Sequence, residues 1–218
     1  MPTLLLIRHG ENDVMHRRLT GRMPEVHLNK RGCEQAEQLA EMLKDAPIKA
    51  IYSSPLERAV ETAEPLARRL GLPVQIAPGL IEVNYGDWQG RTYKQLRRLR
   101  LWKQLQQSPG SIRFPRGESL VEVQQRALQE IESHFDEAND VVAFFAHADI
   151  VRLVMAHYLN MRIDDYQRLV IHPASVSIVQ ITEENTRVLA VNQVHTLSWP
   201  REKPEDEKKK SGRGQKDA

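Results

Sequence analysis

The chain contains 218 residues, of which 40% are hydrophobic, enough for one large α/β domain with room for a small subdomain. The sequence does not open with a basic segment followed by a long apolar core, and no apolar run reaches about 18 residues. We therefore expect neither a secretion signal nor a membrane span. The single cysteine, Cys33, excludes an internal disulfide and a cysteine-clustered metal site, which favours a cytoplasmic protein.

The formal net charge of +2 comes from the carboxyl-terminal tail. Residues 200–218 hold seven of the 31 basic and five of the 29 acidic residues, so the remainder carries equal numbers of each. A neutral body argues against an extended nucleic-acid-binding face, and we expect no nucleic-acid partner. The tail has almost no apolar residues and carries Lys208-Lys209-Lys210 close to two glycines, which predicts disorder. A weak contact with an anionic partner is the alternative role for this tail.

The apolar pattern predicts strands and helices in alternation along the chain. Strands are expected at 4–7, 48–52, 74–76, 141–145, 176–181 and 188–194. The first helix begins after Asn29 as N-cap. Ser54 is expected to cap the second helix with Pro55 in its first turn, and Pro65 predicts a kink or an early end near Glu64.

Three further helical segments are expected in the second half. They are a basic segment at 89–107, a long helix opened by a Ser119/Glu122 capping box, and a helix at 149–159. The apolar stripe of the long helix comprises Leu120, Val123, Ala127, Leu128, Ile131 and Phe135. This alternation predicts a three-layer α/β/α sandwich with a mostly parallel central sheet.

The first predicted strand is followed by Arg8-His9-Gly10, which places His9 at a strand end, where α/β sheets hold their active sites. Gly10 predicts a sharp turn of the backbone there. A guanidinium beside an imidazole can grip an anionic phosphoryl group while a ring nitrogen attacks it. For an isolated histidine, a structural role would be the alternative.

Three later segments strengthen the functional interpretation of His9. They are Ser53-Ser54-Pro55-Leu56-Glu57-Arg58-Ala59 with Thr62-Ala63, Leu80-Ile81-Glu82 with Gly86-Asp87-Trp88-Gln89-Gly90, and Phe144-Phe145-Ala146-His147. Together with Arg8-His9-Gly10, they resemble the histidine phosphatase superfamily, also called the phosphoglycerate-mutase-like family, in order and spacing over residues 3–182. The resemblance implies one such domain at 1–199, followed by the tail.

Charge explains why these residue types suit the chemistry. A phosphate monoester is a dianion that repels most nucleophiles, so an enzyme must neutralise its oxygens before attack. Arg8 and Arg58 each offer a fork of donors, and His147 adds a third partner at a strand-to-helix junction. Arg58 lies about one turn into its predicted helix, near the positive end of the helix dipole.

The resemblance implies the catalytic roles. His9 would be the nucleophile that forms a transient phosphohistidine, with its second ring nitrogen donating to a nearby backbone carbonyl. Glu82 would protonate the leaving oxygen and later take a proton from the hydrolytic water. That role needs a raised pKa, which burial near Tyr85 and Trp88 could produce. The chemistry requires neither a cofactor nor a metal, and we expect a small phosphate monoester as substrate.

Three positions depart from the family pattern. Members commonly carry Thr or Ser where this chain has Asn12, and Asn where it has Met15. Asn12 can still donate to a phosphate oxygen, whereas Met15 cannot. The glycine that often follows the second histidine is Ala148 here, which requires a negative φ. Asn12 and Ala148 are therefore predicted to join Arg8, Arg58 and His147 in substrate binding, and the substrate itself stays unidentified.

A phosphoglycerate mutase is the main rival, because that branch resembles this chain as far as Gly90. Mutases then carry a lysine and, further on, paired arginines, where this chain has Arg91-Thr92-Tyr93 and Trp102-Lys103 in a short insert. A phosphatase is therefore favoured. A silent phospho-ligand-binding protein is the second alternative.

Several features allow two interpretations. The basic segment 91–100 is either a solvated helix face or, if it covers the pocket, a site for a second anionic group. Glu118-Ser119 resembles a family motif at the pocket rim and equally fits a helix cap. His157 is expected to pack in the core. Apolar residues at 99–114 could form a lid or a homodimer interface.

Overall fold

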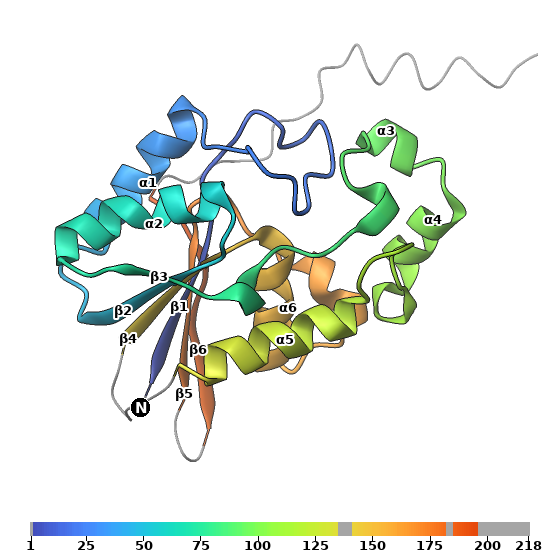
Figure 1. Ribbon diagram of the computed structural model, residues 1–218. Coiled ribbons are helices and arrows are strands. Elements are labelled where there is room, and N and C mark those ends of the chain that lie inside the picture. Colours follow the sequence, from blue (N-terminus) through green and yellow to red (C-terminus); the bar gives the residue numbers. More distant parts are fainter. Residues whose placement is uncertain (1, 135–140, 182–184, 196–218) are drawn as a thin grey trace, which may run out of the picture.

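A six-stranded sheet forms the centre of the computed structural model, which describes residues 2–134, 141–181 and 185–195 (Figure 1). The strands are β1 (Thr3–Arg8), β2 (Ile48–Ser53), β3 (Val74–Ile76), β4 (Val141–Ala146), β5 (Val176–Ile181) and β6 (Thr186–Gln193). Their order across the sheet is β3-β2-β4-β1-β5-β6. The first four strands are parallel to one another, whereas β5 pairs antiparallel with β1 and β6 antiparallel with β5. The predicted mostly parallel sheet is confirmed.

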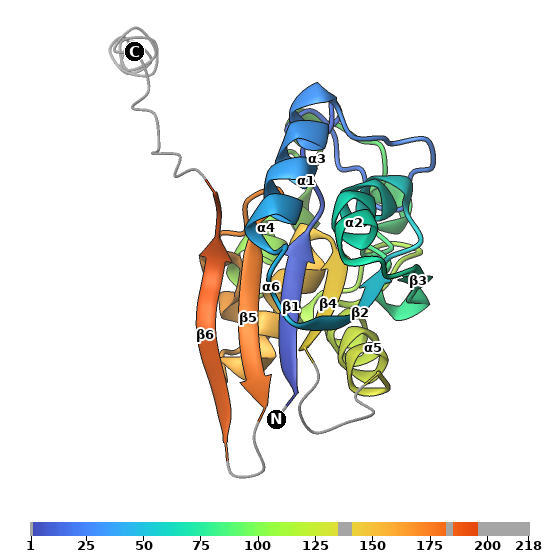
Figure 2. The same cartoon turned by 90° about the vertical axis from the view of Figure 1, so that its left-hand side faces the viewer.

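Helices cover both faces of this sheet (Figures 1 and 2). The α-helices are α1 (Lys30–Met42), α2 (Glu57–Leu70), α3 (Tyr93–Leu96), α4 (Arg100–Gln107), α5 (Leu120–Glu132) and α6 (Ala148–Tyr158). Short 3-10 helices are η1 (Pro78–Leu80), η2 (Gly86–Trp88), η3 (Pro109–Ser111) and η4 (Ile163–Arg168). Helices α1 and α2 lie on one face, and α5 and α6 lie on the other, which gives the predicted three layers.

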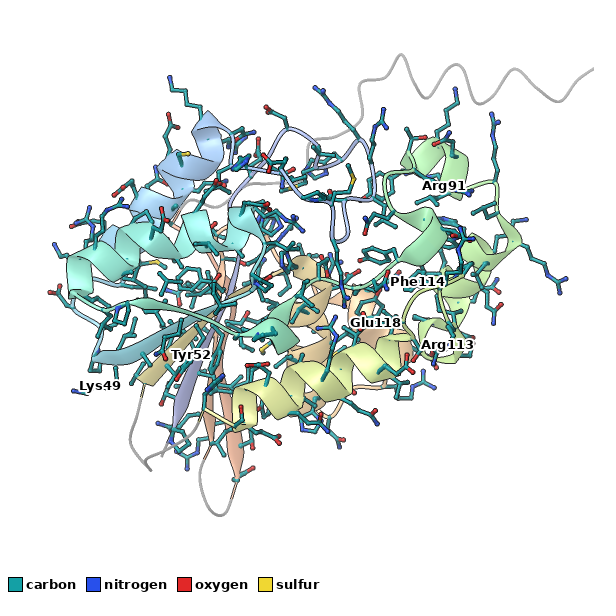
Figure 3. All side chains as sticks on the ribbon, viewed as in Figure 1. Lys49, Tyr52, Arg91, Arg113, Phe114 and Glu118 are labelled. Carbon is teal, nitrogen blue, oxygen red and sulfur yellow. The ribbon has the colours of Figure 1, made fainter. Side chains whose placement is uncertain are left out.

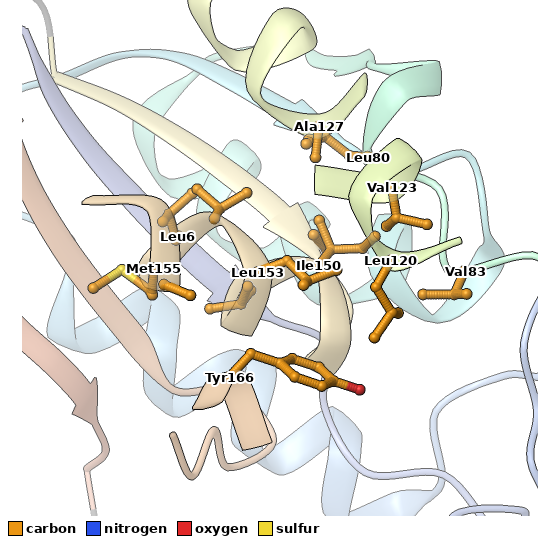
Figure 4. Packing of buried hydrophobic residues seen from close by; sticks show 14 of the residues in the cluster. Leu6, Leu80, Val83, Leu120, Val123, Ala127, Ile150, Leu153, Met155 and Tyr166 are labelled. Atoms are coloured by element: carbon orange, nitrogen blue, oxygen red, sulfur yellow. The ribbon is translucent and has the colours of Figure 1, made fainter. Parts of the chain in front are cut away.

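The alternation of side chains along β1 explains why both faces must be covered. Leu4 and Leu6 belong to the core cluster under α5 and α6, whereas Leu5 and Ile7 belong to the cluster under α1 and α2. All four are buried, and burying such a side chain contributes about 1.5–3 kcal/mol. Figure 4 shows the first cluster, where Leu6 packs near Ile150 and Leu153 of α6.

The second helix differs from its prediction at both ends. Helix α2 begins at Glu57, after Leu56, and so starts two residues later than Pro55. It continues through Pro65 to Leu70, where Gly71 ends it with a left-handed φ of 67°. Pro65 is buried, and Ala63 and Leu66 of the same helix belong to the core cluster under α1 and α2. Packing of the helix on the sheet offsets the hydrogen bond that a helical proline removes.

The basic segment predicted at 89–107 is not one helix. Gly90 adopts a φ of +77° after η2, and Thr92 then caps the short helix α3 with a capping box. A second break at Leu99 precedes α4. We call residues 89–119 the insert, which lies at one end of the molecule in Figure 1.

The remaining sequence predictions are largely confirmed. Ser119 and Glu122 form the predicted capping box of α5, whose buried stripe is Leu120, Val123, Ala127 and Ile131. Phe135 and the tail 200–218 lie outside the described residues. In the described part of the chain, no helix combines the length and the apolar character needed to span a membrane.

Candidate active site

A cavity of about 310 Å³ opens at the edge of the sheet where the parallel strands end. Strands β1 and β4 end in register, with Arg8 opposite Ala146, and β2 ends beside them with Ser53 opposite Phe145. The residues that follow these strands therefore meet at one place. Arg8, His9, Asn12, Arg58, Glu82 and Ala148 all line the cavity.

His9 lies at the end of β1 and is 6% exposed. Its Nδ1 lies 2.7 Å from the carbonyl oxygen of Gly10. Because a carbonyl can only accept, Nδ1 carries the proton and Nε2 keeps its lone pair. Burial, and then the charges of Arg58 and Arg8, hold the pKa of His9 well below its usual value. The imidazole is therefore neutral at physiological pH.

Gly10 is required for space rather than for a left-handed backbone conformation. Its φ is not among the positive values of the described residues. A Cβ at this position would instead lie 2.8 Å from the carbonyl oxygen of Gly32, at the start of α1. The amide of Gly10 also donates to Thr62 Oγ1 on α2 at 3.0 Å. The close approach of β1, α1 and α2 therefore fixes the backbone beside His9.

Two buried arginines bring positive charge to this end of the cavity. Arg8 donates from Nη1 to the carbonyl of Ile171 at 2.6 Å and from Nη2 to Met15 Sδ at 3.2 Å. Arg58 donates from Nη2 to the carbonyl of Gly21 at 2.8 Å. The remaining nitrogens, Arg8 Nε and Arg58 Nε and Nη1, are buried and have no acceptor among the described residues. Burial lowers the pKa of Arg8 to about 10, so it keeps its charge at neutral pH.

His147 lies between β4 and α6, as the N-cap residue of α6, and is fully buried. Its Nε2 lies 2.7 Å from Ser54 Oγ, which also accepts from the amide of Leu56 at 3.4 Å. A hydroxyl that accepts from Leu56 and donates to Nε2 would leave the ring proton on Nδ1. That Nδ1 has no acceptor among the described residues. Ser54, predicted as a helix cap, thus contacts the second histidine instead.

The three positions that depart from the family pattern all lie at the cavity. Asn12 uses Oδ1 to accept from the amides of Val14 and Met15 at 3.1 and 2.9 Å. Met15 supplies a sulfur acceptor to Arg8. Ala148 is the first residue of α6 and has a negative φ, so the missing glycine costs no strain.

Glu82 lines the cavity and is 8% exposed. Its Oε1 accepts from the amide of Val83 at 2.9 Å. Burial raises the pKa of Glu82 to about 7, and the charge of Asp149 adds to this effect, whereas Arg58 opposes it. Asp149 itself accepts from the hydroxyl of Tyr85 at 2.5 Å. No sequence motif indicates Asp149, which is recognisable only by its place in the first turn of α6.

The insert forms the far wall of the cavity. It contributes Tyr93, Trp102, Leu105, Gln106 and Phe114 to the lining. Its backbone pairs with the loop after β1, since Leu19 donates to the carbonyl of Arg91 at 2.9 Å and Gly90 donates to that of Leu19 at 2.8 Å. The basic side chains of the segment 91–100 are exposed, as Figure 3 illustrates for Arg91. They are Arg91, Lys94, Arg97, Arg98 and Arg100.

The structure also shows where Glu118-Ser119 and His157 lie. Glu118 lies behind the cavity wall, where it pairs with Arg22 and Arg126, while Ser119 caps α5. His157 is exposed beside the ring of Tyr158, so the prediction of a core histidine is wrong. It lies on the outward face of α6, while Leu153, Val154 and other apolar residues of the helix fill the core.

Comparison with known proteins agrees with this geometry. Residues 4–194 match the Histidine phosphatase superfamily (branch 1). Phosphoserine phosphatase 1 of Hydrogenobacter thermophilus is 27% identical over 88% of this chain and 92% of its own length. The 2,3-bisphosphoglycerate-dependent phosphoglycerate mutase of Thermoplasma acidophilum is 28% identical over 89% and 94%. The solved structure of YhfR from Bacillus stearothermophilus superposes with a TM-score of 0.83 at 29% identity, covering 89% of this chain and 98% of that one. These matches confirm the predictions of the family, of its fold and of a phosphatase-class enzyme: the chain belongs to the histidine phosphatase superfamily.

Proposed function

We propose that this chain hydrolyses the phosphate monoester of a small metabolite, with His9 as nucleophile and Glu82 as proton donor. The observation that carries the proposal is that a neutral imidazole and two guanidinium groups, those of Arg8 and Arg58, line one cavity. The guanidinium groups would bind the oxygens of a phosphate dianion, and several of their nitrogens have no acceptor among the described residues. The names of the related phosphoserine phosphatase and phosphoglycerate mutase support a phosphorylated metabolite as ligand.

In the first step, the lone pair of His9 Nε2 attacks phosphorus. The P–N bond forms as the P–O bond to the leaving group breaks, and the leaving oxygen takes the proton of Glu82. The Nδ1–H···O bond to Gly10 stabilises the positive charge that develops on the imidazole. Arg8, Arg58 and His147 would hold the equatorial oxygens, whose charge changes little while the transferring group moves between two atoms.

In the second step, ionised Glu82 takes a proton from a water molecule whose oxygen attacks phosphorus. The P–N bond breaks, its electron pair returns to Nε2, and inorganic phosphate leaves. Glu82 is then protonated again and ready for the next substrate. A pKa of about 7 suits a carboxyl group that must be an acid in one step and a base in the next.

The composition of the insert favours hydrolysis over mutase activity. A mutase must hold the substrate through a second anionic group while the phosphoryl group returns to a different oxygen. Aromatic, aliphatic and amide side chains of the insert line the cavity, whereas its cations at 91–100 are exposed. The insert therefore supplies no cation to hold a second anionic group. The other arginines of the lining are Arg18, in the loop after β1, and Arg152 of α6, which pairs with Asp149.

The test is hydrolysis of p-nitrophenyl phosphate with a metal chelator present, for the parent and for His9→Ala and Glu82→Gln. Turnover that survives the chelator and disappears in His9→Ala supports the phosphohistidine route without a metal. Activity retained by His9→Ala would refute the assignment of the nucleophile. Phosphate binding without turnover in the parent would favour a silent binding protein. Assay of 3-phosphoglycerate for phosphate release and for 2-phosphoglycerate separates a phosphatase from a mutase.

A further inference from the structure

A cluster of three charged side chains lies behind Glu82 and holds the backbone of that residue. The carbonyl oxygen of Glu82 accepts from Arg22 Nε at 2.8 Å and from Arg126 Nη2 at 3.3 Å. Both guanidinium groups also bind Glu118. Arg22 Nη2 lies 2.9 Å from Glu118 Oε2, and Arg126 donates from Nε to Oε1 at 2.9 Å and from Nη2 to Oε2 at 3.1 Å.

Glu118 also forms direct hydrogen bonds with the backbone of the same segment. Its Oε2 accepts from the amide of Asn84 at 2.9 Å, and its own amide donates to the carbonyl of Asn84 at 2.9 Å. Arg126 also donates from Nη1 to the carbonyl of Gly79 at 2.6 Å. Residues 79–84, which include Glu82, are thus held by hydrogen bonds to side chains of the loop after β1, the insert and α5. Figure 3 shows Glu118 immediately before α5.

We propose that Glu118 is a positioning residue for Glu82, acting through Arg22 and Arg126 to fix the backbone from which the Glu82 carboxyl enters the cavity. This inference rests on the proposed function, in which Glu82 is the proton donor. The three charged side chains are 21–28% exposed and are not among the described residues that line the cavity. Their effect on the reaction is therefore indirect: it runs through Glu82 and, for Arg126, also through its charge, which lowers the pKa of His147.

Charge gives Glu118 a second effect on the same residue. The positive charge of Arg126 opposes the rise in the pKa of Glu82, and Glu118 lies against both guanidinium groups. Replacing Glu118 by a neutral amide leaves those two charges unbalanced, which should lower the pKa of Glu82. The other charged or titratable groups that act on Glu82 from neighbouring elements are Arg8 of β1, Arg58 of α2, Tyr85, Tyr93 of α3, Asp149 of α6 and Tyr166 of η4.

The experiment compares two substrates that differ in their need for a proton donor. The p-nitrophenolate ion leaves readily without protonation, whereas the phenolate of phenyl phosphate is a poorer leaving group. The measured quantity is kcat/KM, because it reports phosphoryl transfer to His9 even when the later hydrolysis limits kcat. Glu118→Gln should lower kcat/KM for phenyl phosphate by about 10-fold and for p-nitrophenyl phosphate by no more than about 2-fold. The alkaline fall in kcat/KM for phenyl phosphate should also move to lower pH.

Glu122→Gln is the matched control, since Glu122 lies four positions along in the same helix cap and pairs with Arg113 instead. It should affect both substrates equally. Equal losses on both substrates in Glu118→Gln, with an unmoved pH profile, would show a merely structural role and overturn the inference. Should Glu118→Gln fold poorly, Arg22→Gln removes one donor to the Glu82 carbonyl and should show the same dependence on the leaving group.

Glu82→Gln, measured in parallel, distinguishes failure of the positioning role from failure of the proposed function. If Glu82→Gln discriminates between the substrates and neither cluster variant does, the positioning role fails and the proposed function stands. If Glu82→Gln shows no discrimination, the proton-donor assignment fails, and the positioning role fails with it.

Discussion

Replacing Glu82 by glutamine should stabilise the protein at alkaline pH, and the size of the effect follows from the burial of the carboxyl group. Burial raises the pKa of Glu82 from an ordinary 4.5 to about 7. Because the folded-state pKa lies above the unfolded-state value, folding favours the protonated form. The stability that depends on this proton is fully present below pH 4.5 and is lost as the pH rises through about 7.

The difference of about 2.5 pH units, at about 1.36 kcal/mol per unit, corresponds to about 3 kcal/mol. About 2.5 kcal/mol of this develops between pH 5 and pH 8. Glutamine cannot ionise, so the free energy of unfolding of Glu82→Gln minus that of the parent should increase by this amount across the range. Histidines that titrate in the same range affect both proteins alike and cancel in the difference.

Urea denaturation of both proteins at several pH values measures this difference directly. The buffer must be free of phosphate and sulfate, because an anion bound to the folded state would add its own stabilisation. A difference that stays constant from pH 5 to pH 8 would refute the reasoning, since it would mean that Glu82 ionises in the folded protein as readily as in the unfolded chain.

Three further changes test other parts of the structure. Asp149→Asn removes a carboxylate that raises the pKa of Glu82, so the alkaline fall in kcat/KM for phenyl phosphate should shift to lower pH; an unmoved profile would contradict this. Gly10→Ala places a Cβ 2.8 Å from the carbonyl oxygen of Gly32 and should destabilise by about 1–3 kcal/mol in urea titration, a prediction that an unchanged midpoint would contradict. Leu66→Ala empties a fully buried position between α2 and the sheet and should cost about 2–5 kcal/mol while kcat/KM at low temperature is retained; loss of activity in the folded variant would contradict it.

Local patterns predicted the layers of this fold well, because each pattern depends on a periodicity that burial enforces. Leu4 to Ile7 are all apolar because both faces of β1 are covered, and this run correctly predicts a strand inside a parallel sheet. Pro65 shows the limit of such reasoning. A proline usually ends or bends a helix, but here it is buried within α2, other residues of which pack on the sheet, and tertiary packing overrides the local preference.

The sequence motifs predict the residues of the candidate site, but they do not predict the contacts between one motif and another. The resemblance to the histidine phosphatase superfamily joins His9, Arg58, Glu82 and His147 in one hypothesis. The fold places the first three on one cavity and the ring of His147 5.2 Å from that of His9. Ser54 was interpreted as a helix cap, because Ser-Pro is a common helix start, and the sequence holds no sign that His147, 93 residues later, lies 2.7 Å away. Long-range hydrogen bonds of this kind depend on strand order and register, which local patterns do not determine.

The candidate site also shows how one physical cause can set two protonation states at once. Burial disfavours the charged form of any group, so it lowers the pKa of His9 and raises that of Glu82. Near neutral pH the imidazole therefore has a free lone pair, while a large fraction of Glu82 still holds its proton. Arg8 and Arg58 lie in the same cavity, where burial lowers the pKa of both, and Arg8 stays charged because its pKa of about 10 lies above neutrality. Attack on a phosphate dianion requires a nucleophile without a proton, an acid with one and fixed cations; desolvation of a single cavity sets the first two, and guanidinium groups keep their charge in spite of it.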